Sequence, residues 1–258
     1  MTRLSAFLLA VVALVAWGDD PPPPAPLADG PITLVCLGDS LTEGDGDDGN
    51  GGFPARLGRW VAERRPKSQV TNLGRSGWAS WQVVKNDDGS PSQLELAEAA
   101  ISKAEGPCVA CVWIGSNDLW FFYEYDGDAT DETEAANLEA YTKHVTTILT
   151  RLRAKKATVL LALLDDQSKR PVALAGEAFT AITKDELARM SKQVARYNAR
   201  LRELATAHGA LTVDFSGGTW LTDRKGLADD GNHPNARGYD AIAGQWLAAL
   251  EPLLAPRR

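Results

Sequence analysis

Five short apolar runs, separated by longer amphipathic segments, constrain the fold of this chain more than any other feature. The runs are rich in Val, Ile and Leu, and they span residues 32–37, 69–73, 109–114, 158–164 and 211–215. Their apolarity is continuous rather than alternating, as strands require when both faces of their sheet are covered. The sequence therefore predicts a three-layer α/β/α sandwich around a five-stranded parallel sheet.

The segments between these runs have the spacing of amphipathic helices. Apolar residues recur three and four positions apart, which places them on one helical face, and charged residues occupy the other. The expected helices span residues 54–65, 92–105, 133–153, 184–207 and 235–250. The chain has 258 residues, 44% of them hydrophobic, and no internal repeat, so we expect one folded domain over residues 31–258.

The N-terminus has the composition of a secretory signal peptide. Arg3 is followed by an apolar run over residues 6–17, and residues 1–18 together contain the basic, apolar and small-residue parts of such a signal. The run is short for a membrane span, so we expect a secreted or periplasmic protein, with an uncleaved N-terminal anchor as the alternative. Residues 19–30 contain four consecutive prolines and are expected to form an extended linker.

The charge of the chain limits its partners. The formal net charge is −7, and the basic residues form no cluster of the kind that binds phosphates, which argues against nucleic acid as a partner. We expect a small-molecule or glycan substrate that is uncharged at its reacting end. Once the signal is removed, no stable membrane insertion is expected.

Three cysteines cannot all pair within one chain, so at least one is free or intermolecular. Cys108 and Cys111 have the spacing of a redox pair but lie in an apolar run. Three residues along a strand cover roughly 10 Å and reverse the face, which is too far for a disulfide. We therefore expect both to be small buried side chains.

A serine stands where the first predicted strand ends, in Gly38-Asp39-Ser40-Leu41. Parallel-sheet proteins place their chemistry at this edge, so Ser40 is the candidate nucleophile. Further polar blocks follow along the chain, and they are Asn72-Leu-Gly-Arg-Ser-Gly77, Gly115-Ser-Asn117-Asp118 and Asp230-Gly-Asn-His233-Pro234.

Together these four blocks resemble those of the GDSL, or SGNH, hydrolase family, which is named for the Ser, Gly, Asn and His that they carry. The resemblance extends over residues 32–240. It implies a flavodoxin-like strand order and an ester hydrolase that uses no metal or other cofactor. It also implies that Gly77 and Asn117 donate hydrogen bonds to the oxyanion beside the amide of Ser40.

A serine hydroxyl needs a base, and the sequence offers three histidines. His144 falls inside an expected helix and His208 at the end of another, where solvated or capping roles account for them. His233 lies in a loop three positions after Asp230, a spacing that lets the carboxylate orient the imidazole toward the serine. By resemblance Asp230 is the orienting acid, and Asp229 is its alternative.

Two oxyanion assignments have alternatives. Gly74 lies in the same block as Gly77, although a turn with positive φ also accounts for it. Asn117 could be a turn residue at a strand end.

The acidic segment 45–50 invites a calcium interpretation, but residues 45–56 lack the glycine and glutamate that a calcium loop has at its sixth and twelfth positions. We expect a flexible loop at the rim of the active site instead. The acidic segment 123–131 is expected to be a second inserted loop.

Aromatic residues flank two of the motif blocks. Trp78 and Trp81 lie beside the oxyanion glycine, and Trp120 follows the asparagine block. They are candidates for lining a pocket that accepts a sugar face or an acyl chain, with core packing as the alternative.

These features predict an exported serine ester hydrolase with Ser40, His233 and Asp230 as its catalytic residues. The expected substrate is a short acyl ester, such as an acetyl group on a carbohydrate, because the family contains many such deacetylases. Lysophospholipase or broad arylesterase activity, and acyl transfer to an acceptor other than water, are the alternatives among enzymes. A non-catalytic carbohydrate-binding relative is the alternative outside them.

Overall fold

A computed structural model describes residues 25–86, 88–126, 129–176, 178–219 and 221–254. Its centre is a five-stranded sheet in which every strand pair is parallel, with the order β2-β1-β3-β4-β5. The strands are β1 (Thr33–Gly38), β2 (Gln69–Asn72), β3 (Cys108–Trp113), β4 (Thr158–Leu163) and β5 (Leu211–Asp214). The five-stranded parallel sheet and the flavodoxin-like order are both confirmed.

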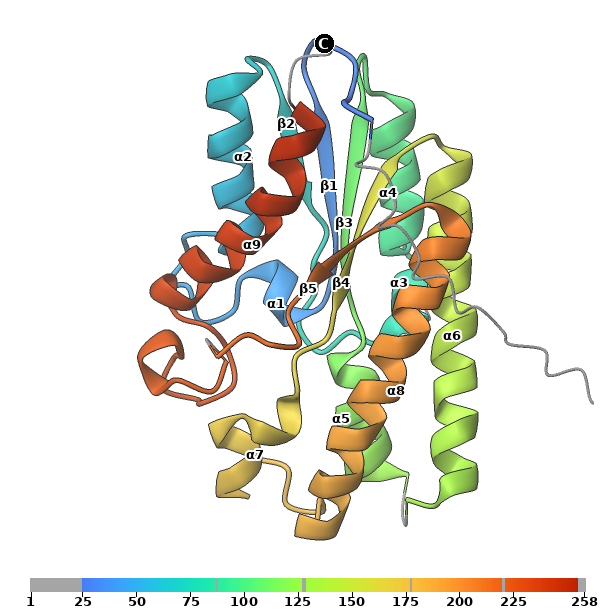
Figure 1. The fold of residues 1–258 in the computed structure, drawn as a ribbon, viewed down its shortest axis with the longest axis vertical. Helices are drawn as coiled ribbons and strands as arrows, with labels where there is room; N and C mark the ends of the chain where they lie inside the picture. The colour runs from blue at the N-terminus through green and yellow to red at the C-terminus, as the bar shows by residue number, and fades with distance from the viewer. Residues whose placement is uncertain (1–24, 87, 127–128, 177, 220, 255–258) are drawn as a thin grey trace, which may run out of the picture.

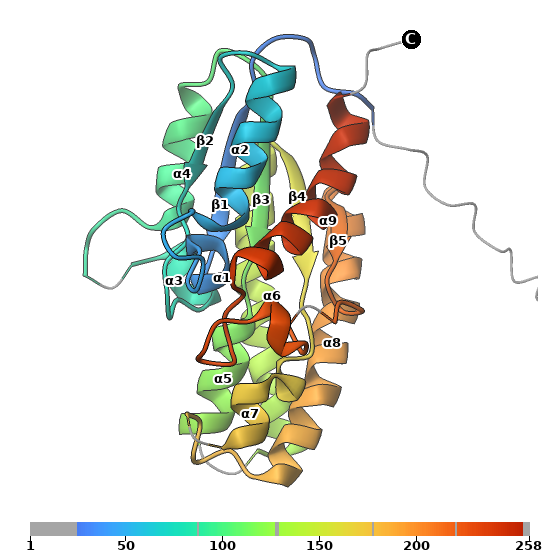
Figure 2. The same ribbon diagram turned by 90° about the vertical axis from the view of Figure 1, so that its left-hand side faces the viewer.

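Helices cover both faces of the sheet. On one face α2 (Gly52–Arg64) packs beside α9 (Ala236–Leu254), and the other face is covered by α3 (Ser80–Val84), α4 (Gln93–Ser102), α6 (Asp131–Ala154) and α8 (Lys184–His208) (Figures 1 and 2). The three-layer sandwich is therefore confirmed. Among the described residues, no helix has the length and apolarity needed to cross a membrane.

Short helices that the sequence analysis did not predict lie beyond the carboxyl ends of the strands. They are α1 (Ser40–Glu43), α5 (Ser116–Tyr125) and α7 (Pro171–Ala175), and α5 and α7 occupy the lower part of Figure 1, below α1. The expected inserted loop 123–131 is wrong at its beginning, because α5 continues to Tyr125 and buries Tyr123 against Glu134 of α6.

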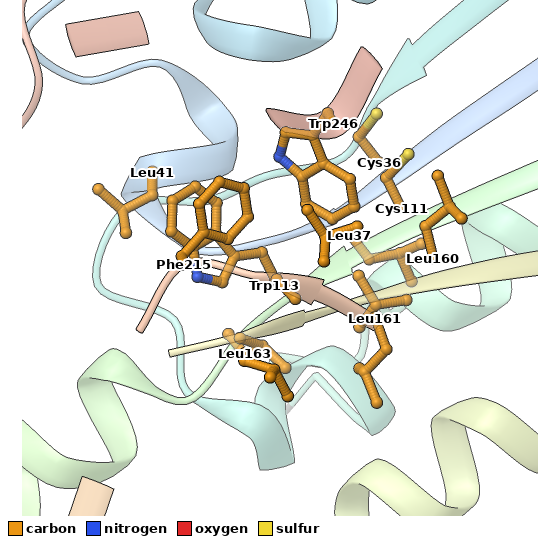
Figure 3. Close-up of a cluster of buried hydrophobic side chains, with 14 of the residues drawn as sticks. Cys36, Leu37, Leu41, Cys111, Trp113, Leu160, Leu161, Leu163, Phe215 and Trp246 are labelled. Carbon is orange, nitrogen blue, oxygen red and sulfur yellow. The ribbon is translucent and has the colours of Figure 1, made fainter. Parts of the chain in front are cut away.

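The core on the α2 and α9 face is aromatic. Trp113 stacks on Phe215 with ring centroids 4.3 Å apart, and Phe53 stacks on Trp246 at 5.1 Å. Figure 3 shows Trp246 of α9 lying over the central strands, next to the sulfur atoms of two cysteines. These large rings fix the distance between the helices and the sheet, and so the position of the loop that precedes α9.

The three cysteines are free and buried, as the sequence predicts for Cys108 and Cys111. Cys36 of β1 lies opposite Cys111 of β3 in the strand register. A hydrogen bond with Cys111, together with burial, raises the pKa of the Cys36 thiol well above its ordinary value, so it stays protonated.

The expected signal peptide 1–18 lies outside the described residues, as does the expected linker up to residue 24. The rest of the linker, residues 25–30, has no helix or strand. Leu27 nonetheless donates its amide to the Leu253 carbonyl at 2.7 Å and packs on the core.

Candidate active site

Ser40 is presented by the turn between β1 and α1. A Cβ atom on Gly38 would lie 2.2 Å from both Thr42 Oγ1 and the Trp113 carbonyl oxygen, so glycine alone fits there. Asp39 caps α1, because its Oδ1 accepts a hydrogen bond from the amide two residues on, at 3.0 Å. The serine thus stands at the edge of the sheet with 9% of its surface exposed.

The structure brings Ser40, His233 and Asp230 into one hydrogen-bonded row. His233 Nε2 lies 2.9 Å from Ser40 Oγ, and His233 Nδ1 lies 2.5 Å from Asp230 Oδ2. Because an ionised carboxylate only accepts, Nδ1 carries the hydrogen and Nε2 can receive the proton of the serine. This is the arrangement that the motif spacing predicts.

The other oxygen of Asp230 holds the backbone of the same loop. It accepts from the amides of His233 at 2.9 Å and Asn232 at 2.8 Å. Burial raises the pKa of Asp230, but these backbone bonds and the imidazole outweigh it, so the pKa lies below its ordinary value. Asp229, the alternative acid, is exposed and lines a cavity of about 380 Å³ beside Pro171 of α7.

The two candidate oxyanion glycines have different surroundings. Gly77 has a φ of +76°, and nothing lies within 4 Å of where its Cβ would be, so its backbone borders open space. Gly74 packs against α1, where a Cβ would lie 2.3 Å from the amide nitrogen of Glu43. Close packing, and not a positive φ as expected, is why Gly74 must be glycine.

Asn117 lies in the first turn of α5, which follows β3 after two residues. Its Nδ2 donates to the carbonyl of Trp78, next to Gly77, at 2.8 Å. The side-chain amide carries a second N–H group that can donate elsewhere. The chain reverses its strand order between β1 and β3, so Ser40 and Asn117 follow the two strands that flank the switch point, where parallel sheets bind ligands.

A buried network fastens the segment after Gly77 to the segment that carries Asn117. Asp118 accepts from the Ser80 amide at 2.9 Å and from Ser80 Oγ at 2.5 Å. Ser80 Oγ in turn lies 3.0 Å from Nδ1 of His144. Burial raises the pKa of Asp118 to about 6, although the bonds from Ser80 oppose it. The expected solvated or capping role of His144 is therefore wrong, because its ring is half-buried and braces this network.

A buried arginine braces the histidine loop, and sequence analysis missed it. Arg170 is 1% exposed and forms two hydrogen bonds with Asp165, at 2.8 and 3.0 Å. Its remaining terminal nitrogen donates to Asn232 Oδ1 at 2.9 Å, and the Val172 amide donates to the Gly231 carbonyl at 3.1 Å. No local pattern marks this role of Arg170, because the loop that it braces lies about sixty residues later in the chain.

Asp39, next to Ser40, is also buried. Burial raises its pKa to about 7, against the opposing effects of a backbone hydrogen bond and of Arg170. Near neutral pH this carboxyl is therefore partly protonated, and it caps α1 as expected of a residue that shapes the loop.

The acidic loop 45–50 does border the active site, but it is fastened rather than free. Asp47 is fully buried and bridges Arg56 at 2.6 Å while accepting from the Gly52 amide at 2.8 Å. Arg56 also bridges Asp240 of α9 at 2.6 Å. Within the residues that the structure describes, no group of three or more His, Cys, Asp and Glu side chains is arranged to hold a metal ion.

The aromatic candidates differ in exposure. Trp81 is 38% exposed and packs against Phe121, and Trp78 is half-buried beneath the guanidinium of Arg75. Trp120 is 2% exposed and stacks on Phe179, with centroids 4.0 Å apart. Trp120 is therefore part of the core, which was the alternative to a pocket-lining role for this residue.

A sequence model of the GDSL-like lipase/acylhydrolase family matches residues 36–241, which include all four motif blocks. The chain belongs to this family. It is accordingly a carboxylic ester hydrolase, and the resemblance seen in the sequence is confirmed. A search of curated proteins returned no match.

Several solved structures share the fold of this GDSL-like hydrolase. A putative GDSL-like lipase from Parabacteroides merdae is 17% identical with a TM-score of 0.64, and the match covers 89% of this chain and all of that one. A catalytic mutant of an acetylxylan esterase from Geobacillus stearothermophilus is 16% identical with a TM-score of 0.60, covering 90% and 100%. A psychrotrophic esterase from Pseudoalteromonas is 16% identical with a TM-score of 0.58, covering 86% and 98%.

Replacing Arg170 by Gln should impair both stability and turnover of this hydrolase. The change leaves the carboxylate of Asp165 buried without its partner, so the free energy of unfolding should fall by about 3–5 kcal/mol. In the protein that remains folded, kcat should fall about 10- to 100-fold because the histidine loop is held less accurately. Urea denaturation and ester hydrolysis measure the two effects.

Arg189 provides the control, because its guanidinium pairs with the buried carboxylate of Glu134. This pair joins α8 to α6 and does not involve the loop that carries His233. Arg189→Gln should lower stability and leave kcat of the folded protein unchanged. Equal kcat in the two variants would contradict the positioning role of Arg170.

Proposed function

We propose that this protein hydrolyses esters through a Ser40-His233-Asp230 triad. Ser40 Oγ attacks the acyl carbonyl while His233 Nε2 takes the serine proton, and Asp230 holds the imidazole in the required tautomer. His233 then returns the proton to the leaving alcohol, and water releases the acyl group by the same steps. The row of hydrogen bonds from Ser40 Oγ to Asp230 Oδ2 is the observation that carries the proposal.

The negative oxygen of the tetrahedral intermediate needs donors on the opposite side of the acyl carbon. The amides of Ser40 and Gly77 and the side chain of Asn117 are proposed for this role. The open space beside Gly77 and the bond that fixes Asn117 against Trp78 support it. No metal or other cofactor enters these steps.

A non-catalytic binding protein is the less favoured function. A fold that only binds a carbohydrate has no physical need for an imidazole between a serine and a carboxylate. An acyltransferase would use the same residues with an alcohol in place of water, so the two differ only in the acceptor.

The proposed substrate is a short acyl ester, such as an acetyl group on a carbohydrate. The proposal is supported by the fold shared with an acetylxylan esterase and by the exposed Trp81, which could stack against a sugar. We also propose that residues 1–18 direct export, so that the enzyme acts in the periplasm or outside the cell. Lysophospholipase and arylesterase activities remain the alternatives for the substrate.

Ser40→Ala tests the nucleophile. It should lower kcat for p-nitrophenyl acetate by at least about 10³-fold, because the remaining groups can bind the ester but cannot form the acyl-enzyme. Ser102→Ala, at the end of α4, should hydrolyse the ester as the wild type does. Equal rates for Ser40→Ala and wild type would remove Ser40 from the mechanism.

Asn117→Ala tests the oxyanion donors. Loss of one donor should lower kcat by about 10²- to 10³-fold with little change in KM or in thermal unfolding. Asn86→Ala, in an exposed loop, is the matched control. An unchanged kcat in Asn117→Ala would show that this side chain only shapes a turn.

Esters that differ in acyl length and in leaving group test the proposed substrate. Hydrolysis rates should fall steeply from acetate to octanoate among p-nitrophenyl esters. Acetylated oligosaccharides should release acetate when incubated with the enzyme. Acetate release is measured directly, with Ser40→Ala as the blank. A preference for octanoate would instead support the lipase alternative.

A further inference from the structure

A second carboxylate lies on the substrate side of the catalytic imidazole. Asp45 Oδ2 is 4.0 Å from His233 Nε2, the nitrogen that faces Ser40. Asp230 occupies the other ring nitrogen, so the proposed catalytic base stands between two acids. The side chain of Asp45 is 33% exposed, which leaves it in contact with the solvent into which a leaving alcohol departs.

The backbone at Asp45 is fixed by several elements. Gly44 ends α1 with a φ of 109°, and the Asp45 amide donates to the Ser40 carbonyl at 3.1 Å. The buried hydroxyl of Tyr239, from α9, donates to the Asp45 carbonyl at 3.0 Å. A Cβ on Gly46 would lie 3.1 Å from the Cβ of His233, so this loop packs directly against the histidine.

The carboxylate of Asp45 is fixed as well. Its Oδ2 accepts from Ser76 Oγ at 2.8 Å, and the Ser76 amide donates to Glu43 Oε2 at 2.5 Å. Ser76 precedes the proposed oxyanion residue Gly77. The carboxylates of Asp45 and Glu43 are thus both hydrogen-bonded to Ser76.

This arrangement has two electrostatic consequences. During acyl transfer His233 becomes an imidazolium, and a fixed negative charge 4.0 Å from its Nε2 stabilises that cation. The same charge repels a leaving group that is itself negative. Water screens both effects, because Asp45 is partly exposed.

We propose that Asp45 selects esters by the charge of their leaving alcohol, favouring uncharged or cationic alcohols and rejecting anionic ones. Asp45 does so while stabilising the imidazolium, so it acts as a specificity-determining and positioning residue. The proposal depends on the proposed triad, since it assigns to His233 the role of base.

Other charged groups also contribute to the electrostatic potential at His233. They are Asp230 in its own loop, Asp39 behind the serine, Arg170 through Asn232, and Glu43 beside Asp45. All of them remain in place when Asp45 alone is changed.

Asp45→Asn is the direct test, because asparagine keeps the shape and can still accept from Ser76. Three acetyl esters serve as substrates: 4-acetoxybenzoate, which is anionic, its neutral methyl ester, and the cationic 3-(trimethylammonio)phenyl acetate. The variant-to-wild-type ratio of kcat/KM is compared among them, so that intrinsic reactivity cancels. We expect this ratio to be about threefold or more higher for the anionic ester than for the neutral one, and lowest for the cationic ester.

Salt dependence gives a readout that a purely structural role would not change. In the wild type, high salt should weaken the discrimination between the anionic and neutral esters. Asp45→Glu keeps the negative charge, so it should discriminate among the three esters as the wild type does.

Asp48→Asn is the matched control. Asp48 is exposed in the same loop with a φ of 48°, which asparagine tolerates, and its replacement changes the net charge by the same amount. It should leave the substrate ratios and their salt dependence unchanged.

Identical substrate ratios and identical salt dependence in Asp45→Asn and Asp48→Asn would overturn the proposal. If Asp45→Asn fails to fold, Ser76→Ala is the alternative, because it releases the Asp45 carboxylate from its fixed position. It should reduce the differences in kcat/KM among the anionic, neutral and cationic esters. Unaltered differences in Ser76→Ala would also overturn the proposal. Failure of the triad itself would be seen separately, as full activity in Ser40→Ala.

Discussion

The hydrogen bond between Ser40 Oγ and His233 Nε2 joins residues 193 positions apart, and the rest of the structure serves to make that contact possible. Ser40 is placed by β1, an inner strand of the sheet. His233 is placed by the loop before α9, whose Trp246 and Tyr239 anchor the helix to the core. Parallel strands end at one edge, so the first strand and the last loop can meet there.

Three polar braces surround this contact, and each joins segments that are distant in sequence. Asp118 and Ser80 fasten the segments that carry Gly77 and Asn117, Arg170 fastens the histidine loop, and Ser76 fixes the carboxylate of Asp45. Buried charges such as those of Arg170 and Asp165 contribute little net stability, because desolvation offsets their attraction. Their value to an esterase is accuracy of position, on which acyl transfer depends strongly.

Local patterns predicted most of the fold. Continuous apolar runs marked all five strands, and helical spacing marked α2, α4, α6, α8 and α9. The shorter α1, α5 and α7 were missed because each is brief or is stabilised by contacts with distant segments rather than by its own periodicity. The motif blocks predicted Ser40, His233 and Asp230 because the chemistry requires those residue types at that spacing.

By itself, the sequence determined the strand and helix pattern, the family and the residues proposed to react, since these depend on local spacing and residue type. Only the tertiary structure decided what surrounds those groups. It placed Trp120 in the core, gave His144 a bracing role, and brought Arg170 and Asp45 to the histidine. The physical reason is that burial and electrostatic proximity depend on distances in space, which residues far apart along the chain do not reveal.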